Sequence, residues 1–312
     1  MTEKKENKLI AFIKSYHTEN FKWNDFFIIP LLIALVLFEV GALIAGNVLA
    51  LILYNVVDSQ DFDYFYFLTN YLMFTGVWLI FLLYFLIKSN RPLYGAIWKK
   101  CKGNTLKNLG LGLLIGFGTN GLCILIAALH KDIHLYFEGA NIIKLLVLFI
   151  AVFIQSSAEE LMCRGFIYQR LRRGYRHPAV AIIGNASLFA FLHIFNPGVN
   201  ALAIINIILV GISYSLFVYY CDSIWIPMAA HAAWNYTQNI IFGLPNSGIV
   251  SKFSIFKLDA TTATDSFAYN VGFGVESTIV AAIVLTLCCV LTIYWGKKNK
   301  KHPTDIWEKA DK

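Results

Sequence analysis

Charged residues are scarce in this sequence: Asp, Glu, Lys and Arg make up 14% of its 312 residues, whereas hydrophobic residues make up 58%. A soluble domain has about 25% charged residues, so this scarcity excludes an ordinary soluble fold. Composition and length instead indicate one polytopic membrane bundle. The net charge of +7 requires no nucleic-acid partner. Its lysines and arginines cluster beside apolar segments, where such residues flank a membrane.

The sequence also lacks the pattern of a signal peptide and any C-x-x-C pair of cysteines. Residues 1–25 are polar and lysine-rich, unlike a signal peptide. We therefore expect a cytoplasmic N-terminal segment, followed by a first helix that serves as its own insertion signal. The six cysteines form no C-x-x-C pair, and all lie in or beside apolar segments. They are expected to be small hydrophobic residues rather than a disulfide framework or a zinc site.

Long apolar runs dominate the rest of the chain and predict membrane-spanning helices. We expect an all-α polytopic bundle of about eight such helices over residues 26–296, and a basic cytoplasmic tail at 297–312. Segments rich in Lys and Arg alternate with segments that have few, which places both termini in the cytoplasm. The outer loop 244–275 is polar and is assigned no secondary structure. The eight runs are residues 26–57, 64–87, 108–129, 142–163, 178–195, 200–220, 224–243 and 276–296.

Five acidic or histidine side chains lie within these apolar runs, past the first residue of each run. On insertion scales each one costs about 2.5–3.5 kcal/mol, and such a residue suggests a functional site. Four of the five lie close together in the second half of the chain. The remaining one, Glu39, is expected to be a hydrogen-bond partner between helices. The five residues are Glu39, Glu159, Glu160, His193 and His231.

The stretch AEELMCR places two carboxylates and a guanidinium in the fourth apolar run. Residues four apart share a helix face, so Glu160 is expected to pair with Arg164. Glu159 is rotated by about 100° from Glu160 and would remain the free carboxylate. An internal pair of this kind could also serve only to pack helices. The helical pattern continues beyond this run, through residues 164–176.

Two other apolar runs also present a polar face. Phe189 and His193 lie four residues apart, and so do His231 and Asn235. We expect these faces to turn inward and to meet the free carboxylate in one cavity. Either histidine could instead only bond a backbone carbonyl, and asparagine commonly joins helices.

A carboxylate and an imidazole in one cavity can activate water. Glu159 and His193 would hold a water and take its proton during attack on a carbonyl. His231 and Asn235 would donate hydrogen bonds to the oxyanion. A zinc ion on Glu159, His193 and His231 would use the same atoms. Metal is the less favoured alternative, because the carboxylates that usually support ligating histidines are not evident. The chain has no H-E-x-x-H, no G-x-S-G in a span and no pair of intramembrane aspartates.

These motifs resemble those of the CPBP intramembrane proteases, which include CaaX prenyl endopeptidases and bacteriocin-processing and self-immunity (Abi) proteins. The family pattern is E-E-x-x-x-R, then F-x-x-x-H, then H-x-x-x-N, and the resemblance covers about residues 145–240. It implies an eight-helix fold with a catalytic cavity open toward membrane and cytosol. A metal-free glutamate mechanism is favoured for the CaaX members, although the family was first described as zinc-dependent. By resemblance, water is activated by Glu159 and His193, and the oxyanion is held by His231 and Asn235. The supporting residues are Glu160, Arg164 and Phe189.

The leading hypothesis is an intramembrane endopeptidase, of glutamate type or zinc-dependent, that cleaves a membrane-associated peptide or protein. A composition rich in Phe, Ile and Lys is typical of a low-GC bacterium and suggests a bacterial cell membrane. Leader peptides, pheromone peptides or bacteriocin immunity would then be the expected context. The alternative is a catalytically unused scaffold or a self-immunity or regulatory protein, with a sensor kinase or another membrane protein as partner. A transporter is a third hypothesis, although the repeated halves typical of transporters are absent.

Overall fold

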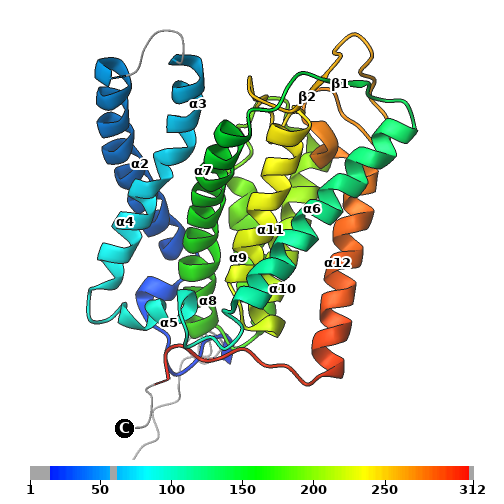
Figure 1. Cartoon of the computed structure of the whole chain (residues 1–312). Coiled ribbons are helices and arrows are strands. Elements are labelled where there is room, and N and C mark those ends of the chain that lie inside the picture. The colour runs from blue at the N-terminus through cyan, green and yellow to red at the C-terminus, as the bar shows by residue number, and fades with distance from the viewer. Residues whose placement is uncertain (1–14, 57–61, 309–312) are drawn as a thin grey trace, which may run out of the picture.

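The computed structural model describes residues 15–56 and 62–308, which form a bundle of helices with almost no sheet (Figure 1). Within these residues, six helices are long and apolar enough to cross a membrane. The predicted all-α, multi-pass membrane class is therefore confirmed. The number of eight spans and the cytoplasmic termini stay predictions. Residues 1–14 of the predicted N-terminal segment and 309–312 of the tail lie outside the described residues.

The first helices form a hairpin at one side of the bundle (Figure 1). It consists of α2 (Ile28–Val56), α3 (Phe62–Leu72) and α4 (Phe74–Phe85). The predicted run 64–87 is thus two helices that are interrupted at Met73. The break is small, because Gly76 N bonds Met73 O at 3.1 Å and the chain continues in the same direction.

Helices α6, α7 and α11 form the centre of the bundle. They span Leu106–Leu129, Ile142–Glu160 and Trp225–Asn235. Glycine lets α6 approach α11 closely: a Cβ atom at Gly116 would lie 2.2 Å from the carbonyl oxygen of Ala230. Small residues at such contacts are the usual device for close helix packing in membranes.

The fourth apolar run forms one long helix, as its continuing pattern suggested. After α7 the chain passes through the π-helical segment η3 (Leu161–Ile167) into α8 (Tyr168–Gly174). The whole helix covers residues 142–174 and is 33 residues long. Glu159 therefore lies near its middle rather than at its end. Such π-helical segments are frequent at functional sites.

One predicted helix end was wrong. Helix α9 ends at Phe191 and not at residue 195, so His193 lies in the turn that follows it. The turn continues through Pro197, which cannot extend a helix, and Gly198, whose φ of +74° favours glycine. The run 224–243 is α11 followed by the π-helical segment η4 (Tyr236–Ile241). The remaining long helices are α9 (Pro178–Phe191), α10 (Ala201–Cys221) and α12 (Ile279–Lys298).

The outer loop has regular structure, so the expectation of none was wrong. Strand β2 (Phe256–Leu258) pairs antiparallel with β1 (Leu135–Phe137), and Tyr136 lies opposite Lys257. The aromatic rings of Phe137 and Phe256 are 5.9 Å apart. The loop ends in the 3₁₀ turn η5 (Gly274–Ser277). Pairing with a strand far away in the sequence gives no local sequence signal.

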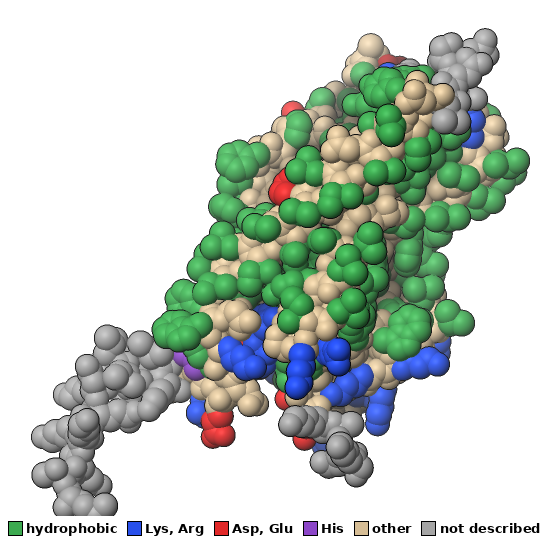
Figure 2. Space-filling view, turned by 90° about the vertical axis from the view of Figure 1, so that its left-hand side faces the viewer, with side chains coloured by type: hydrophobic (Ala, Val, Ile, Leu, Met, Phe, Trp, Pro, Cys, Tyr) green, Lys and Arg blue, Asp and Glu red, His purple; other side chains and the backbone are tan. Residues whose placement is uncertain are grey.

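The opposite end of the bundle is basic. Figure 2 shows lysines and arginines gathered at one end of a mostly hydrophobic face, as the alternation of charged segments predicted. The buried Asp25, in η1 (Trp23–Asp25), accepts a hydrogen bond from Arg173 Nε at 2.7 Å. The short elements η2 (Arg91–Leu93) and α5 (Tyr94–Ile97) also lie in this part of the chain. The tail turns back beneath the bundle, where Thr304 N bonds Asp222 Oδ1 at 2.9 Å. All six cysteines are free, as expected.

Candidate active site

The predicted pair of Glu160 and Arg164 is formed and is completely buried. Arg164 Nη1 lies 3.0 Å from Glu160 Oε1, and both side chains have no exposed surface. Arg164 Nη2 also donates to the carbonyl oxygen of Gly211 on α10, at 3.1 Å. Its guanidinium lies over the ring of Phe189, 4.8 Å from the ring centre. Phe189 therefore supports the pair, as the motif suggested.

His231 lies between the two glutamates. Its Nδ1 atom is 3.0 Å from Glu160 Oε1, and its Nε2 atom is 3.8 Å from Glu159 Oε2. Two carboxylates beside one guanidinium leave one negative charge. A protonated His231 would make the group of four neutral, which lowers the cost of placing it in a membrane. In that form both ring nitrogens carry a hydrogen and can donate.

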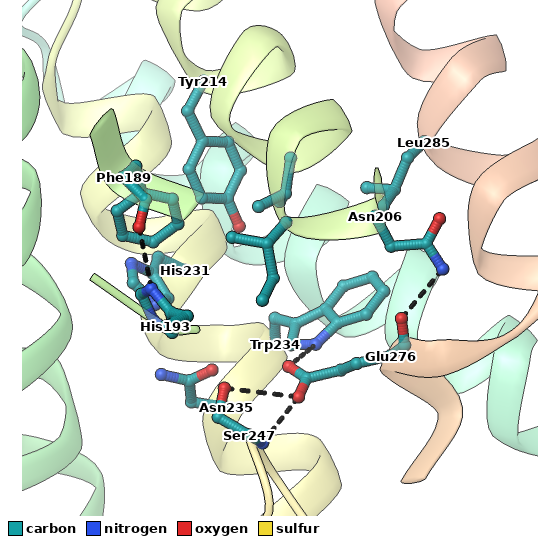
Figure 3. Close-up of a pocket in the computed structure, with 12 residues that line it drawn as sticks. Phe189, His193, Asn206, Tyr214, His231, Trp234, Asn235, Ser247, Glu276 and Leu285 are labelled. Carbon is teal, nitrogen blue, oxygen red and sulfur yellow. Dashed lines mark hydrogen bonds between the residues drawn. The ribbon is translucent and has the colours of Figure 1, made fainter. Parts of the chain in front are cut away.

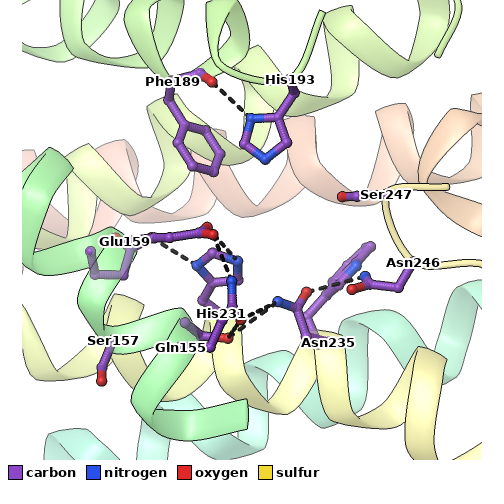
Figure 4. Close-up of polar contacts among 12 residues, drawn as sticks. Gln155, Ser157, Glu159, Phe189, His193, His231, Asn235, Asn246 and Ser247 are labelled. Carbon is purple, nitrogen blue, oxygen red and sulfur yellow. Dashed lines mark hydrogen bonds and ion pairs between the residues drawn. The ribbon is translucent and has the colours of Figure 1, made fainter. Parts of the chain in front are cut away.

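Glu159 opens toward the interior of the bundle, rotated away from the buried pair as its spacing predicted. Its carboxylate is 17% exposed, whereas that of Glu160 is fully buried. Gln155, one turn earlier on α7, donates from Nε2 to Glu159 Oε1 at 2.6 Å. This hydrogen bond holds one carboxylate oxygen. The other oxygen, Oε2, faces His231 and the cavity (Figure 4).

His193 approaches the same space from the turn after α9 (Figure 4). Its Nδ1 atom lies 2.9 Å from the carbonyl oxygen of Phe189. A carbonyl only accepts, so Nδ1 must carry the hydrogen. In the neutral ring Nε2 is then an acceptor. Because α9 ends at Phe191, His193 lies in a turn, from which it lines the same cavity as His231.

Asn235 is oriented by a chain of hydrogen bonds that begins at Glu276 and passes through Asn246 (the last bond is drawn in Figure 4). Glu276 Oε1 accepts from the indole of Trp234 and from Asn246 Nδ2, both at 3.0 Å. Asn246 Nδ2 also donates to Asn235 Oδ1 at 3.2 Å. The amide nitrogen of Asn235 therefore points the other way, toward α7, where it bonds Ser156 Oγ at 3.2 Å.

The carboxyl group of Glu276 is held in place by the outer loop. Its Oε2 atom accepts from the backbone N–H of Ser247 at 2.6 Å. Burial raises the pKa of this carboxyl, and the hydrogen bonds from Ser247 and Trp234 oppose that change. Glu276 lies in η5, just before α12, and not within a membrane-spanning helix.

Residues of all three motifs line one cavity of about 810 Å³. It is lined by all four residues predicted to be catalytic, which are Glu159, His193, His231 and Asn235. A smaller cavity of about 50 Å³ lies beside it, between His231 and Glu276 (Figure 3). This space is large enough for a water molecule or two. The expectation that three polar faces meet in one place is thus confirmed.

Comparison with known proteins identifies the same part of the chain. Residues 141–237 match the model of a family described as type II CAAX prenyl endopeptidase Rce1-like. That match confirms the resemblance to the CPBP family. Its bounds agree with the 145–240 read from the motifs. The chain is also 28% identical over 278 residues to "Uncharacterized protein YyaK" of Bacillus subtilis (strain 168), covering 78% of this chain and 87% of that protein.

The CPBP-like segment does not contain the whole site. Asn246 and Glu276 lie beyond residue 237 and were not predicted. Asn246 sits in the polar outer loop, where polar residues are ordinary, and Glu276 stands at the very start of the last apolar run. Gln155 was also missed, although an amide four residues before Glu159 in an apolar run was a usable signal. Glu39 was expected to bond a neighbouring helix. Among residues 15–56 and 62–308 it has no hydrogen bond or ion pair, and it lines the large cavity instead.

A zinc ion held by side chains of this segment was the alternative expectation for the site. In the described part of the chain, no three His, Cys, Asp or Glu side chains are arranged to hold a metal ion. Nδ1 of His231 faces Glu160 and Nδ1 of His193 faces a backbone carbonyl, which leaves Nε2 of each ring for another partner, as in a histidine that binds a metal. The side chains of Glu159, His193 and His231 are thus not gathered around one metal position in this structure.

Proposed function

We propose that this integral, multi-pass membrane protein is an intramembrane endopeptidase that cleaves a membrane-associated peptide or protein. The family match supports this activity at the level of the family. The observation that carries the proposal is the meeting of the three motifs: Glu159, His193, His231 and Asn235 line one cavity of about 810 Å³. A space of this size accommodates an extended stretch of a few residues.

Water would be activated between Glu159 and His193. Nε2 of His193 accepts one hydrogen of the water, and Glu159 Oε2 takes the other as a proton. The water oxygen then forms a bond to the carbonyl carbon of the substrate, and the carbonyl oxygen becomes an oxyanion. Gln155 keeps the other oxygen of Glu159 in place, so the free oxygen points at the water.

The oxyanion would be stabilised by donors on α11. Nε2 of a protonated His231 can donate, and the amide nitrogen of Asn235 can exchange its bond to Ser156 for one to the substrate. Removal of one such donor typically lowers the rate by about 10²- to 10³-fold. The tetrahedral intermediate then collapses: the C–N bond breaks, and the proton on Glu159 passes to the leaving nitrogen. The products are a carboxylic acid and an amine.

The buried pair of Glu160 and Arg164 would support this chemistry without touching the substrate. Glu160 accepts from Nδ1 of His231 at 3.0 Å and so fixes the direction of the ring. A ring fixed in this way keeps Nε2 toward the cavity. Arrangements in which a carboxylate orients a catalytic imidazole recur in hydrolases.

Two variants test the proposal: Glu159→Ala and, separately, His231→Ala. The purified full-length chain in detergent is incubated with a detergent-solubilised bacterial membrane fraction, and released peptides are identified by mass spectrometry. Glu138→Gln serves as control, because this exposed carboxylate pairs with Lys257 outside the cavity. Peptide release should be lost in both test variants and retained in the control. Unchanged release in both would favour the scaffold or regulatory alternative.

A further inference from the structure

Glu39 is a carboxylate on a membrane-spanning helix that the proposed reaction does not use. It lies in α2, amid the run VLFEVGALI, and its side chain is exposed. It lines the same cavity as Glu159 and His193. Ionisable residues at such positions are rare and are usually found where a substrate or ion passes.

The helix contacts place Glu39 at the depth of the site. Helices α2 and α4 touch at Gly41, where a Cβ atom would lie 2.6 Å from the carbonyl oxygen of Gly76. In this antiparallel pair, Glu39 lies two residues before Gly41, and Trp78 lies two residues after Gly76. The indole of Trp78 bonds Ser157 Oγ at 3.1 Å. Ser157 is two residues from Glu159, which is about 3 Å along a helix axis.

The cavity has an unbalanced negative charge on the side of α2. Glu160, Arg164 and His231 interact with one another. In the described parts of the chain, no Lys, Arg or His forms an ion pair with Glu39. Lys252 also lines the cavity, but it has an interaction of its own.

A second acceptor lies on the same wall. Asn70 of α3 is exposed and lines the cavity, and no hydrogen bond of its side chain is found within residues 15–56 and 62–308. The carboxylate of Glu39 only accepts hydrogen bonds, and the carboxamide oxygen of Asn70 can also accept. Such a set suits a cationic group that carries several N–H donors.

We propose that Glu39 binds a basic side chain, Lys or Arg, of the substrate peptide. The inference rests on the proposed function, because it places this side chain opposite Glu159 while the peptide bond is cleaved. Glu39 would thus determine specificity: a peptide with a basic residue near the cleaved bond neutralises a carboxylate that has no ion-pair partner among the described residues. A peptide without one leaves that carboxylate unpaired.

Peptide binding tests this inference without requiring cleavage. The probe is a short palmitoylated and fluorescently labelled peptide of Ala and Ser with one Lys, moved through every position. Its counterparts have norleucine or Glu at the same place. Binding is measured by fluorescence anisotropy to the full chain in detergent, in a Glu159→Gln background, so that the peptide is not consumed. Glu39→Gln and Glu39→Lys are then added, with Glu138→Gln as the matched carboxylate control.

At one or two positions, the Lys peptide should bind about tenfold or more tightly than the norleucine peptide, as expected for one charge-assisted contact. Glu39→Gln should abolish the difference, Glu39→Lys should shift the preference to the Glu peptide, and Glu138→Gln should change nothing. Equal or undetectable binding of the Lys and norleucine peptides at every position would overturn the inference. So would a Lys preference that survives Glu39→Gln. Cleavage that survives Glu159→Gln would overturn only the proposed function.

Discussion

The Nδ1 atom of His231 lies 3.0 Å from Oε1 of Glu160, so the second carboxylate of the EE motif is a partner of the histidine and not a spare base. The same carboxylate oxygen is 3.0 Å from Arg164 Nη1. One buried oxygen thus joins the ion pair between α7 and η3 to the imidazole of α11. The roles of the neighbouring glutamates differ because one lies in this network and the other opens into the cavity.

Arg164→Ala should mainly reduce stability. It removes the cation from a pair that has no exposed surface and leaves a buried carboxylate with His231 as its remaining charged neighbour. Breaking a buried pair in this way costs about 3–5 kcal/mol. Thermal unfolding in detergent should show a clearly lower midpoint. Arg91→Ala is the control, because Arg91 is exposed and bonds only a nearby carbonyl. An unfolding midpoint equal to that of the control would contradict the structural role.

Two glycines of α6 give a matched pair of substitutions. A Cβ atom at Gly116 would lie 2.2 Å from Ala230 O, one residue before His231, whereas a Cβ atom at Gly118 would meet nothing within 4 Å. Gly116→Ala should therefore push α11 away and lower both unfolding midpoint and cleavage rate. Gly118→Ala should be neutral or stabilise by up to about 1 kcal/mol through helix propensity. Equal effects of the two substitutions would show that the close approach of α6 and α11 is not required.

Asn246→Ala should lower the cleavage rate although Asn246 lies outside the three motifs. The change removes the hydrogen bond to Asn235 Oδ1 and leaves that amide free to turn. One hydrogen bond of about 1–1.5 kcal/mol corresponds to a rate loss of about tenfold. The loss is expected in kcat with little change in KM. Asn299→Ala is the control, since this exposed asparagine bonds only its own helix. A loss confined to KM would mean that Asn246 contacts the substrate instead.

A strong chelator should leave cleavage unchanged. The site needs no metal in the proposed mechanism, and the described residues offer no three-ligand group for one. The measurement is the cleavage rate before and after chelation, together with the zinc content of the purified protein. Loss of activity on chelation that zinc restores would replace the glutamate mechanism with a metal-dependent one.

The sequence predicted the centre of the site well, because its signals are local. Four-residue spacing on a helix is a property of the chain itself, so the Glu160–Arg164 pair and the open position of Glu159 followed from geometry alone. The cavity followed from the cost of leaving polar faces in lipid. These arguments require only that the residues lie on helices, and long apolar runs predict helices strongly.

The parts that depend on distant contacts could not be predicted. Asn246 comes from the outer loop and Glu276 from its junction with the last apolar run, where a polar residue has no special meaning until the loop is seen to fold over α11. The end of α9 before His193 was also missed, since an apolar run does not show where its helix stops. Pro197 and Gly198, a few residues later, were the available signals for that turn.

The central claim is that Glu159 activates the attacking water, and the cleavage rate of Glu159→Gln tests it most directly. Glutamine keeps the shape of the side chain but cannot take a proton. We expect a folded protein with an unfolding midpoint near that of wild type and a cleavage rate at least 10²-fold lower. Full cleavage by the folded Glu159→Gln protein would contradict the account, even if the family resemblance stood.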